Sequence, residues 1–512
     1  MKILNGSAKF AFPRSGHTIQ YNTNAMKSLY QLSLFLFILA FSPACKPVNR
    51  QGSPGNLNYI RVSQMNPTYF EFADGTPYIP VGINLINPSS RFRNNPDSSL
   101  SEVIGWMRNL SENGGNYVRI WLSESFWDVE DQQAGVYSEA KAARIDSFFA
   151  AARKYNLRVK ITLEHFRSLT MEENPQSWAM KAVYHRSHGG PLDSIRQYLT
   201  APEGQRLFLD KIDYYKKRYG SDTLFFGWEL WNEMNAMHVP MDSVFFAWNE
   251  KMLAEVKQRF PRNLVMQSFG SFDDEGIRPY YQKLMHMPGN EVAQIHRYLD
   301  PGAPMEICQK PMDIICSSAV GELRSYKPGK PLLLAETGAV EWQHSGPSKL
   351  YPKDTAGILL HDILFAPFFS GAAGTGMSWH WDSYVDRNHL WYHFRRFSEA
   401  VKGLNPAEED FRPSLTETGD LRIYWLTGKH TVMVWIRDSR DTWKTELVEE
   451  KPPRTIQGIG IDPEESGITG KFENISIYDP WKDRWTQSGS DGPGVILPDF
   501  KRSLVVRMTR TK

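Results

Sequence analysis

Residues 224–234 read Leu-Phe-Phe-Gly-Trp-Glu-Leu-Trp-Asn-Glu-Met, an apolar run that ends in an amide and a carboxylic acid. A short apolar run of this kind is typical of a buried β-strand. We therefore expect Glu233 at the C-terminal tip of a strand, with Asn232 beside it. A carboxylic acid in that position can act as a general acid, and such chemistry requires a second carboxylate.

A second run of the same shape supplies that carboxylate. Residues 330–336 read Lys-Pro-Leu-Leu-Leu-Ala-Glu and end in Glu336, which lies 336 − 233 = 103 positions after Glu233. Two strand tips so far apart in sequence meet only if the fold brings them together, as the C-terminal rim of a parallel barrel does. The pair of glutamates therefore predicts a fold and a chemistry together.

Apolar strand-like runs alternate with helical patterns between residues 69 and 381. Residues 69–86 indicate a hairpin with an Asp74-Gly75 turn that leads into the first buried strand. A capping box at residues 99–102 predicts the start of the first helix. The expected strands are 81–86, 117–121, 158–163, 224–233, 264–267, 292–296, 330–336 and 376–381.

Strands that alternate with helices pair in parallel, and eight such units are what a closed (β/α)8 TIM barrel needs. In this count Glu233 ends the fourth strand and Glu336 the seventh. A doubly wound open sheet is the structural alternative, but the sequence lacks the Gly-rich phosphate loop that is typical of one. We predict the barrel, an α/β fold, over residues 57–405.

From about Pro406 the pattern changes to short alternating runs separated by turn residues, such as 422–426, 432–436, 475–478 and 503–508. This pattern predicts a small all-β, sandwich-like module over residues 406–512. The module either binds carbohydrate or packs against the barrel as a structural cap.

The composition excludes several classes of function. With 59 basic and 57 acidic residues in 512, the net charge of +2 lacks the basic excess of a nucleic-acid-binding protein. The 16 Trp and 22 Tyr suit stacking on sugar rings, although core packing explains most of them. No CxxC or HExxH motif indicates a metal, and we predict no cofactor. Cys308 and Cys316 lie close in sequence, which permits a disulfide without establishing one.

The N-terminal region, residues 1–45, has the pattern of a secretory signal. Lys27 precedes an apolar run at residues 32–41 that is too short to span a bilayer comfortably. Met26 is a candidate start codon. The run ends in Ser-Pro-Ala-Cys, which resembles a bacterial lipobox with Cys45 as the lipidated residue, and residues 46–56 indicate a flexible tether.

We therefore expect export, with the protein held on the cell envelope or surface as a bacterial lipoprotein. A secreted or periplasmic protein is the alternative. A lipid anchor at Cys45 would be its sole contact with a membrane. The sequence leaves the oligomeric state open.

Across residues 69 to about 405 the chain resembles the clan A retaining glycoside hydrolases, particularly the cellulase and β-mannanase-like family. The matching stretches, in order, are residues 74–77, 81–84, 118–121, 228–233, 295–298, 331–336 and 378–379. The resemblance implies Glu233 as acid/base, Glu336 as nucleophile, Asn232 on the sugar 2-hydroxyl and Trp379 as the platform under the reacting sugar. It further implies a supporting shell of Arg119, His296 and Tyr298.

The residue types also fit the chemistry directly. Retention requires two carboxyls about 5 to 5.5 Å apart. Arg119 and Tyr298 would keep Glu336 ionised, while Trp231 and the charge of Glu336 would keep Glu233 protonated.

Other residues admit two interpretations. Glu229, on the same strand face as Glu233, is expected to be a buried partner of a barrel Arg or His rather than a catalyst. Arg119 is either structural or substrate-facing, and His165 either lines the cleft or binds a loop carbonyl. Either a sugar subsite or packing under a loop is a possible role for each of four tryptophans, Trp121, Trp127, Trp342 and Trp381. Glu341 is a candidate distal subsite residue, and His380 and Asp382 have no assigned role.

Two rival functions remain. One is a metal-dependent barrel hydrolase with His165, His296 and Asp300 as ligands, although its usual His-x-His is absent where residues 82–84 read Gly-Ile-Asn. The other is a non-catalytic surface lipoprotein that binds glycans. For a glycosidase, β-mannan is the first expected substrate, followed by β-glucan and xylan. Internal or terminal cleavage depends on loops such as 167–200 and 300–328.

Overall fold

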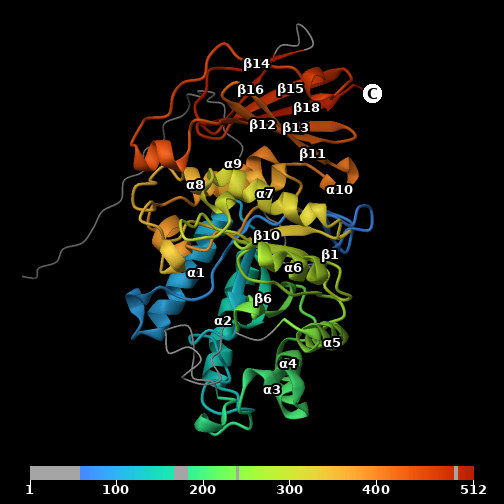
Figure 1. Ribbon diagram of the computed structural model, residues 1–512, viewed down its shortest axis with the longest axis vertical. Coiled ribbons are helices and arrows are strands. Elements are labelled where there is room, and N and C mark those ends of the chain that lie inside the picture. Colours follow the sequence, from blue (N-terminus) through green and yellow to red (C-terminus); the bar gives the residue numbers. More distant parts are fainter. Residues whose placement is uncertain (1–57, 166–182, 238–240, 489–493, 512) are drawn as a thin grey trace, which may run out of the picture. The chain divides into compact units, whose positions relative to one another are not determined.

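The computed structural model describes residues 58–165, 183–237, 241–488 and 494–511 (Figure 1). The chain divides into two compact units, Met1–Gly55 and Asn56–Lys512, and all described residues belong to the second. The predicted signal, Cys45 and the whole tether lie outside the described residues, as does part of the loop at 167–200.

Parallel strands and helices alternate through the first part of the described chain. The strands are β4 (Gly82–Asn84), β5 (Tyr117–Trp121), β6 (Arg158–Glu164), β7 (Phe225–Trp231), β8 (Leu264–Met266), β9 (Ala293–His296) and β10 (Leu332–Glu336). The helices are α1 (Pro96–Glu112), α2 (Glu139–Lys154), α3 (Ile195–Thr200), α4 (Pro202–Tyr219), α5 (Ser243–Arg259), α6 (Arg278–Met285), α7 (Met312–Ser325), α8 (Ile358–Phe369), α9 (Tyr392–Ala400) and α10 (Pro406–Glu409).

These strands form a five-stranded parallel sheet, β4-β5-β6-β7-β8, and a two-stranded parallel sheet, β10-β9. Isolated parallel bridges span the gaps: Ser271 pairs with His296, and Ser378 pairs with both Thr337 and Ile83. Among the described residues no continuous ladder closes the ring. The barrel prediction is therefore confirmed in part, for its parallel α/β order.

The predicted eighth strand, 376–381, contributes a single bridging residue instead of a ladder. Met377 N–H donates to Leu334 O at 3.0 Å, and Asn84 N–H donates to Ser378 O at 3.3 Å. The segment thus lies between β10 and β4, where an eighth strand belongs. The chain leaves this position at once, because Trp379 already begins a bend and residues 381–386 form a helical turn.

A three-stranded antiparallel sheet precedes the barrel: β1 (Ile60–Val62), β2 (Phe70–Phe72) and β3 (Pro77–Tyr78). The predicted turn between β2 and β3 is present, with Gly75 at φ +87°, a left-handed conformation that glycine adopts without strain. Phe70 packs edge-on against Phe226 of β7 with ring centroids 5.0 Å apart. The sheet therefore covers the barrel near the start of β7.

The predicted capping box at residues 99–102 is wrong. Helix α1 begins one turn earlier, at Pro96, and Asn95 caps it by accepting a hydrogen bond from Ser98 N–H at 3.0 Å. Glu102 instead accepts from the backbone N–H and the hydroxyl of Ser89, at 2.9 and 2.8 Å. An Asn-Pro pair is a strong start signal, because proline at the first helical position needs no N–H partner.

The C-terminal part is all-β, as predicted. Six antiparallel strands pair in the order β11-β12-β13-β18-β15-β16, and a small pair, β14-β17, adds a second sheet. Their bounds are β11 (Arg412–Thr418), β12 (Leu421–Thr427), β13 (Thr431–Asp438), β14 (Gly460–Ile461), β15 (Phe472–Asp479), β16 (Arg484–Gln487), β17 (Val495–Ile496) and β18 (Ser503–Arg510). Unit Asn56–Lys512 does not divide further, so the boundary at 405/406 stays a prediction.

Helix α8 joins the two parts of the fold. Every residue from Ile358 to Phe369 is buried, which a surface helix with one apolar face would not allow. Phe365 and Phe369 of α8 lie 5.9 and 6.2 Å from the ring of Trp435 in β13. Figure 1 shows α7 and α8 between the barrel strands and the C-terminal sheet, so one core continues from the barrel into that sheet.

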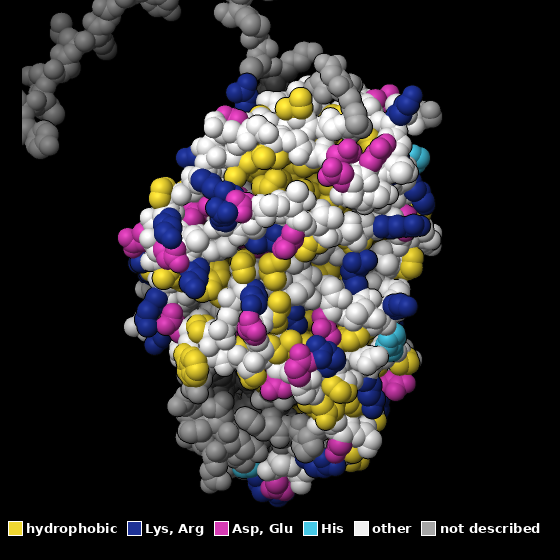
Figure 2. Space-filling model, turned by 45° about the horizontal axis from the view of Figure 1, so that its top comes forward, with side chains coloured by type: hydrophobic (Ala, Val, Ile, Leu, Met, Phe, Trp, Pro, Cys, Tyr) yellow, Lys and Arg dark blue, Asp and Glu magenta, His cyan; other side chains and the backbone are white. Residues whose placement is uncertain are grey.

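On the outer surface, acidic and basic side chains are interspersed over the face seen in Figure 2, in keeping with the near balance of charges. Of the helices in the described residues, none has both the length and the hydropathy to span a bilayer.

Candidate active site

Glu233 and Glu336 meet at the C-terminal ends of β7 and β10. A carboxylate oxygen of each and a ring nitrogen of His296 all lie within 4.8 Å of one another. His296 Nδ1 is 2.6 Å from Glu233 Oε1 and 3.4 Å from Glu336 Oε2. The nearest oxygens of the two carboxyls thus lie within 4.8 Å, which is closer than the roughly 6.5 to 9.5 Å of an inverting glycosidase and compatible with the roughly 5 to 5.5 Å of a retaining one.

The backbone of Glu233 is strained. Its φ of +48° lies in the left-handed region, which a residue with a Cβ rarely adopts. Ala236 N–H donates to Glu233 O at 2.8 Å, so a tight turn after β7 holds this conformation. Such strain tends to occur where a side chain must be aimed at a site.

Glu336 receives two donors that favour its charged form. The Tyr298 hydroxyl donates to Oε2 at 2.9 Å, and Arg119 Nη1 donates to Oε1. Burial raises the pKa of Glu336 above its ordinary value, but Arg119 and Tyr298 oppose that rise. Glu336 is 3% exposed, so the donors act with little screening by water.

Glu233 has the opposite environment. Burial raises the pKa of Glu233 well above its ordinary value, and the neighbouring charge of Glu336 raises it further. Two carboxyls this close hold one proton between them, and the donors on Glu336 direct that proton to Glu233. The two carboxyls therefore have different surroundings, since the donors contact Glu336 and burial dominates at Glu233.

Arg119 is fully buried beneath the pair. Its Nη2 donates to Glu229 Oε2 at 2.6 Å and to Asn232 Oδ1 at 2.7 Å. Lys160 Nζ lies 3.1 Å from Glu229 Oε1, and burial lowers the pKa of Lys160 to about 7. The prediction that Glu229 is a buried partner of a barrel arginine is confirmed. Against the effect of burial, Arg119 and Lys160 lower the pKa of Glu229.

Asn232 and the aromatic residues complete the site. The Nδ2 of Asn232 has no hydrogen-bond partner within the described residues, and the side chain is 1% exposed. Trp379 packs on Trp121 with ring centroids 5.0 Å apart. His165 also stacks on Trp121, with ring centroids 5.0 Å apart, and its Nδ1 lies 2.6 Å from Ser123 Oγ.

The other predicted subsite residues lie in different settings. Trp127 is buried and donates to Ile86 O at 2.7 Å, so it packs under a loop. Trp381 is also buried, at 6% exposure, whereas Trp342 is 60% exposed after β10. Glu341 pairs with Lys349 at 3.0 Å.

The three residues considered as metal ligands do not come together. His296 lies between the two glutamates and His165 lies beside Ser123. Asp300 instead binds His344 Nε2 at 2.9 Å, and Asp273 lies 3.8 Å from the same nitrogen. Two groups in the described residues are close enough to hold an ion, Glu233-His296-Glu336 and Asp273-Asp300-His344. Cys308 and Cys316 are free, buried thiols.

Sequence reasoning missed several residues around the site. Asn84 at the end of β4 accepts from Arg119 Nη1 at 3.4 Å, and Lys160 completes the charge network below. The alternation of side chains along β6 could have placed Lys160 on the inward face from the sequence alone. Asp273 and His344 lie on loops and carry no such signal.

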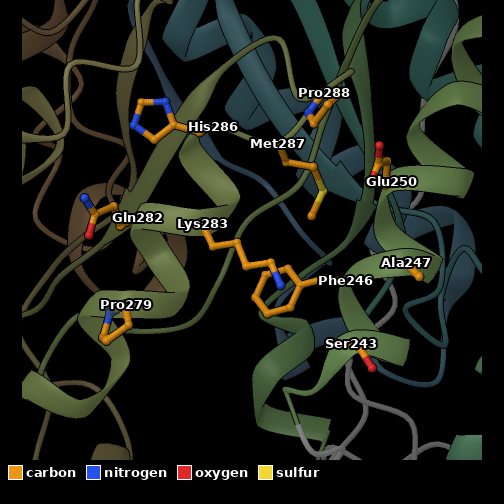
Figure 3. A pocket seen from close by; sticks show the side chains of 10 residues that line it. All are labelled: Ser243, Phe246, Ala247, Glu250, Pro279, Gln282, Lys283, His286, Met287 and Pro288. Atoms are coloured by element: carbon orange, nitrogen blue, oxygen red, sulfur yellow. The ribbon is translucent and has the colours of Figure 1, made fainter.

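A surface hollow of about 620 Å³ lies away from this site, between α5 and α6 (Figure 3). Phe246, Glu250, Lys283 and Met287 line it, and none of the predicted site residues does.

Two buried carboxyls at the tips of parallel strands are the arrangement expected of a glycosyl hydrolase. The comparisons agree with that class. No family model matches the chain. Mannan endo-1,4-β-mannosidase 3 of Oryza sativa subsp. japonica is 23% identical over 391 residues, 70% of this chain and 79% of that protein.

Among solved structures, a glycoside hydrolase family 5 protein from Bacteroides vulgatus shares the fold, with a TM-score of 0.54 and 13% identity over 89% of this chain and 94% of that one. An exo-β-1,4-mannosidase from an Opitutaceae bacterium matches at a TM-score of 0.46 and 19% identity over 62% of this chain, which spans 54% of that protein's length. The rice relative and the Bacteroides vulgatus structure confirm the predicted resemblance to cellulase and β-mannanase-like glycoside hydrolases.

Proposed function

We propose that this protein is a retaining glycoside hydrolase that cleaves β-linked glycans by double displacement. The observation that carries the proposal is the approach of a carboxylate oxygen of Glu233 to one of Glu336 within 4.8 Å, with Arg119 and Tyr298 donating to Glu336 and not to Glu233. Identification of the first-formed anomer by NMR tests it: the product must keep the configuration of the substrate.

In the first step Glu336 attacks the anomeric carbon while Glu233 gives its proton to the leaving oxygen. A glycosyl ester on Glu336 results, and loss of the negative charge there lowers the pKa of Glu233. Glu233 can then take a proton from water as that water attacks the ester. His296 Nδ1 contacts both carboxyls and keeps their relative positions fixed through both steps.

The remaining site residues take roles that suit their contacts. Asn232 Nδ2, which lacks a protein partner in the described chain, binds the 2-hydroxyl of the reacting sugar. Trp379 supports the sugar ring, and Trp121 and His165 stack behind it. Arg119 acts through Glu336 and Asn232 and is a positioning residue.

For the substrate we propose β-mannan first, with β-glucan and xylan next. The similar rice protein is a mannan endo-1,4-β-mannosidase, which supports β-mannan as the first choice. A panel of the three polysaccharides, with chromatography of early products, tests the choice: oligosaccharides of mixed length indicate internal cuts, and a single short product indicates cuts at chain ends.

We also propose that the protein is exported and lipidated at Cys45, since the predicted signal ends in a lipobox-like sequence. Labelling with radioactive palmitate in a bacterial host tests this proposal: label must enter the intact protein and be lost in Cys45→Ser.

Tyr298→Phe is expected to shift the acid limb of the kcat/KM profile to higher pH. The hydroxyl donates to the charged form of Glu336, so its removal raises the pKa of that carboxyl. The nucleophile then becomes protonated at a higher pH than in the wild-type protein. A pH series with an aryl β-glycoside measures the limb, and an unchanged acid limb contradicts the assignment of Glu336.

Removal of divalent metals is expected to leave activity unchanged. His165, His296 and Asp300 lie apart, and the pair of carboxyls needs no ion for double displacement. Dialysis against EDTA followed by assay and elemental analysis checks this. Stoichiometric zinc, with activity lost on its removal, would favour the metal-dependent hydrolase.

A further inference from the structure

His380 follows the proposed sugar platform, Trp379, and has no role in the mechanism above. Its side chain is 8% exposed, and its Nδ1 lies 2.8 Å from the hydroxyl oxygen of Tyr351. That same oxygen accepts a hydrogen bond from Ala339 N–H at 2.6 Å. The imidazole is therefore tied to the loop that follows the nucleophile strand.

These contacts fix which ring nitrogen carries the proton. Tyr351 is buried and its oxygen already accepts from Ala339, so its own hydrogen must be donated to His380 Nδ1 to be satisfied. Nδ1 is thus an acceptor, and Nε2 carries the hydrogen. Burial lowers the pKa of His380 to about 3, so the ring is neutral and Nε2–H is its one donor over the working range of a glycosidase.

The ring borders the pocket of the nucleophile. A Cβ placed on Gly338, two residues after Glu336, would lie 3.2 Å from His380 Nδ1 and 3.7 Å from Tyr298 Cε1. Tyr298 is the residue whose hydroxyl donates to Glu336. His380 and Tyr298 therefore flank the same glycine, next to the attacking carboxylate.

The Nε2–H donor of His380 has no hydrogen-bond partner within the described residues. Three other ring nitrogens without a partner, Nε2 of His296 and Nδ1 of His361 and His393, are enclosed by protein, but Nε2 of His380 is not among the enclosed atoms. A neutral donor that is held in one tautomer and not enclosed by protein suits the hydroxyl of a sugar, which accepts hydrogen bonds without charge.

We propose that His380 is a substrate-binding residue that donates from Nε2–H to a hydroxyl of the sugar supported by Trp379. Tyr351 is its positioning residue, because it sets the tautomer and the ring orientation. This inference rests on the proposed glycosidase function and adds to it a determinant of which sugar is accepted.

The test pairs His380→Ala with substrates that each lack one hydroxyl. The parent substrate is an aryl β-glycoside oligosaccharide, and in each analogue one hydroxyl of the reacting sugar is replaced by hydrogen. His380→Ala is expected to lower kcat/KM on the parent about 10- to 100-fold. For the analogue that lacks the hydroxyl bound by His380, kcat/KM of the wild-type protein should fall by a similar factor. His380→Ala should not lower kcat/KM on this analogue further, because the hydrogen bond is already absent.

His380→Gln, whose amide can donate from a similar reach, should recover part of the loss and keeps the test usable if the alanine variant does not fold. His286→Ala is the matched control: this exposed histidine borders the hollow in Figure 3 and should not alter kcat/KM. If removal of each hydroxyl lowers kcat/KM by the same factor in the wild-type protein and in His380→Ala, the assignment of His380 is overturned. A wild-type protein inactive on all parent glycosides would instead overturn the proposed function, and this inference with it.

Discussion

Glu336→Ala is expected to lower kcat/KM by about four to six orders of magnitude, because it removes the atom that attacks the anomeric carbon. Glu336 is 3% exposed and receives donors from Arg119 and Tyr298, so a water molecule in its place would not be oriented or charged in the same way. Initial rates on an aryl β-glycoside with a good leaving group measure the loss.

Added azide separates a nucleophile from other essential carboxylates. Azide fits the space left by the Glu336 side chain and attacks the anomeric carbon itself. It should therefore restore turnover of the alanine variant and give a glycosyl azide of inverted configuration. No rescue, or a product of retained configuration, would assign Glu336 another role. Glu306→Ala, at an exposed glutamate paired with Lys310, should behave as wild type.

Glu233→Ala should respond differently in the same assay. An activated leaving group needs no proton, so formation of the glycosyl ester should continue while its hydrolysis, which needs a base, slows. Azide should then speed release and yield a product of retained configuration. The contrast follows from the two environments, since Arg119 and Tyr298 donate to Glu336 and burial keeps the proton on Glu233.

The sequence predicted the two strands that end near Glu233 and Glu336 because the relevant signals are local. An apolar run that ends in a carboxylate describes β7 and β10 almost residue by residue, and the period of two correctly placed Glu229 on the inward face beside Arg119. The parallel order also follows from local alternation of helix and strand.

Other features depend on contacts that sequence patterns do not carry. The eighth strand has the right composition, but its length as a paired strand is set by its neighbours, and Ser378 alone forms bridges. His380 and Tyr351 are 29 positions apart and meet through loops. Loop conformations are set by tertiary packing, so the surroundings of the site were less predictable than its two carboxylates.

Arg437→Met is expected to lower the free energy of unfolding by about 3 to 5 kcal/mol. Arg437 of β13 is 6% exposed and binds Asp362 of α8 through two hydrogen bonds of 2.9 and 2.5 Å. Without Arg437, the buried carboxyl of Asp362 loses this ion pair. Its neighbour Asp313 remains paired with Arg422 at 2.7 Å. Chemical denaturation at pH 7 measures the change.

The loss should also depend on pH. Burial raises the pKa of Asp362 to about 7 even with Arg437 present. A carboxyl whose pKa is higher in the folded than in the unfolded state binds more protons when folded. Its contribution to the free energy of unfolding therefore declines as the pH rises from the unfolded-state pKa to the folded-state pKa. Arg437→Met should therefore lie closer to wild type at pH 5 than at pH 8.

Two controls bracket this prediction. Arg440 forms a surface pair with Asp420 at 2.8 Å, and Arg440→Met should cost less than about 1 kcal/mol. The double variant Arg437→Met with Asp362→Leu removes both charges and should recover much of the stability. If Arg437→Met lowered the free energy of unfolding no more than Arg440→Met, the contact between α8 and the C-terminal sheet would contribute little to stability. A large loss in one cooperative transition would instead make the C-terminal sheet a structural cap of the barrel, in agreement with the burial of α8 on every side.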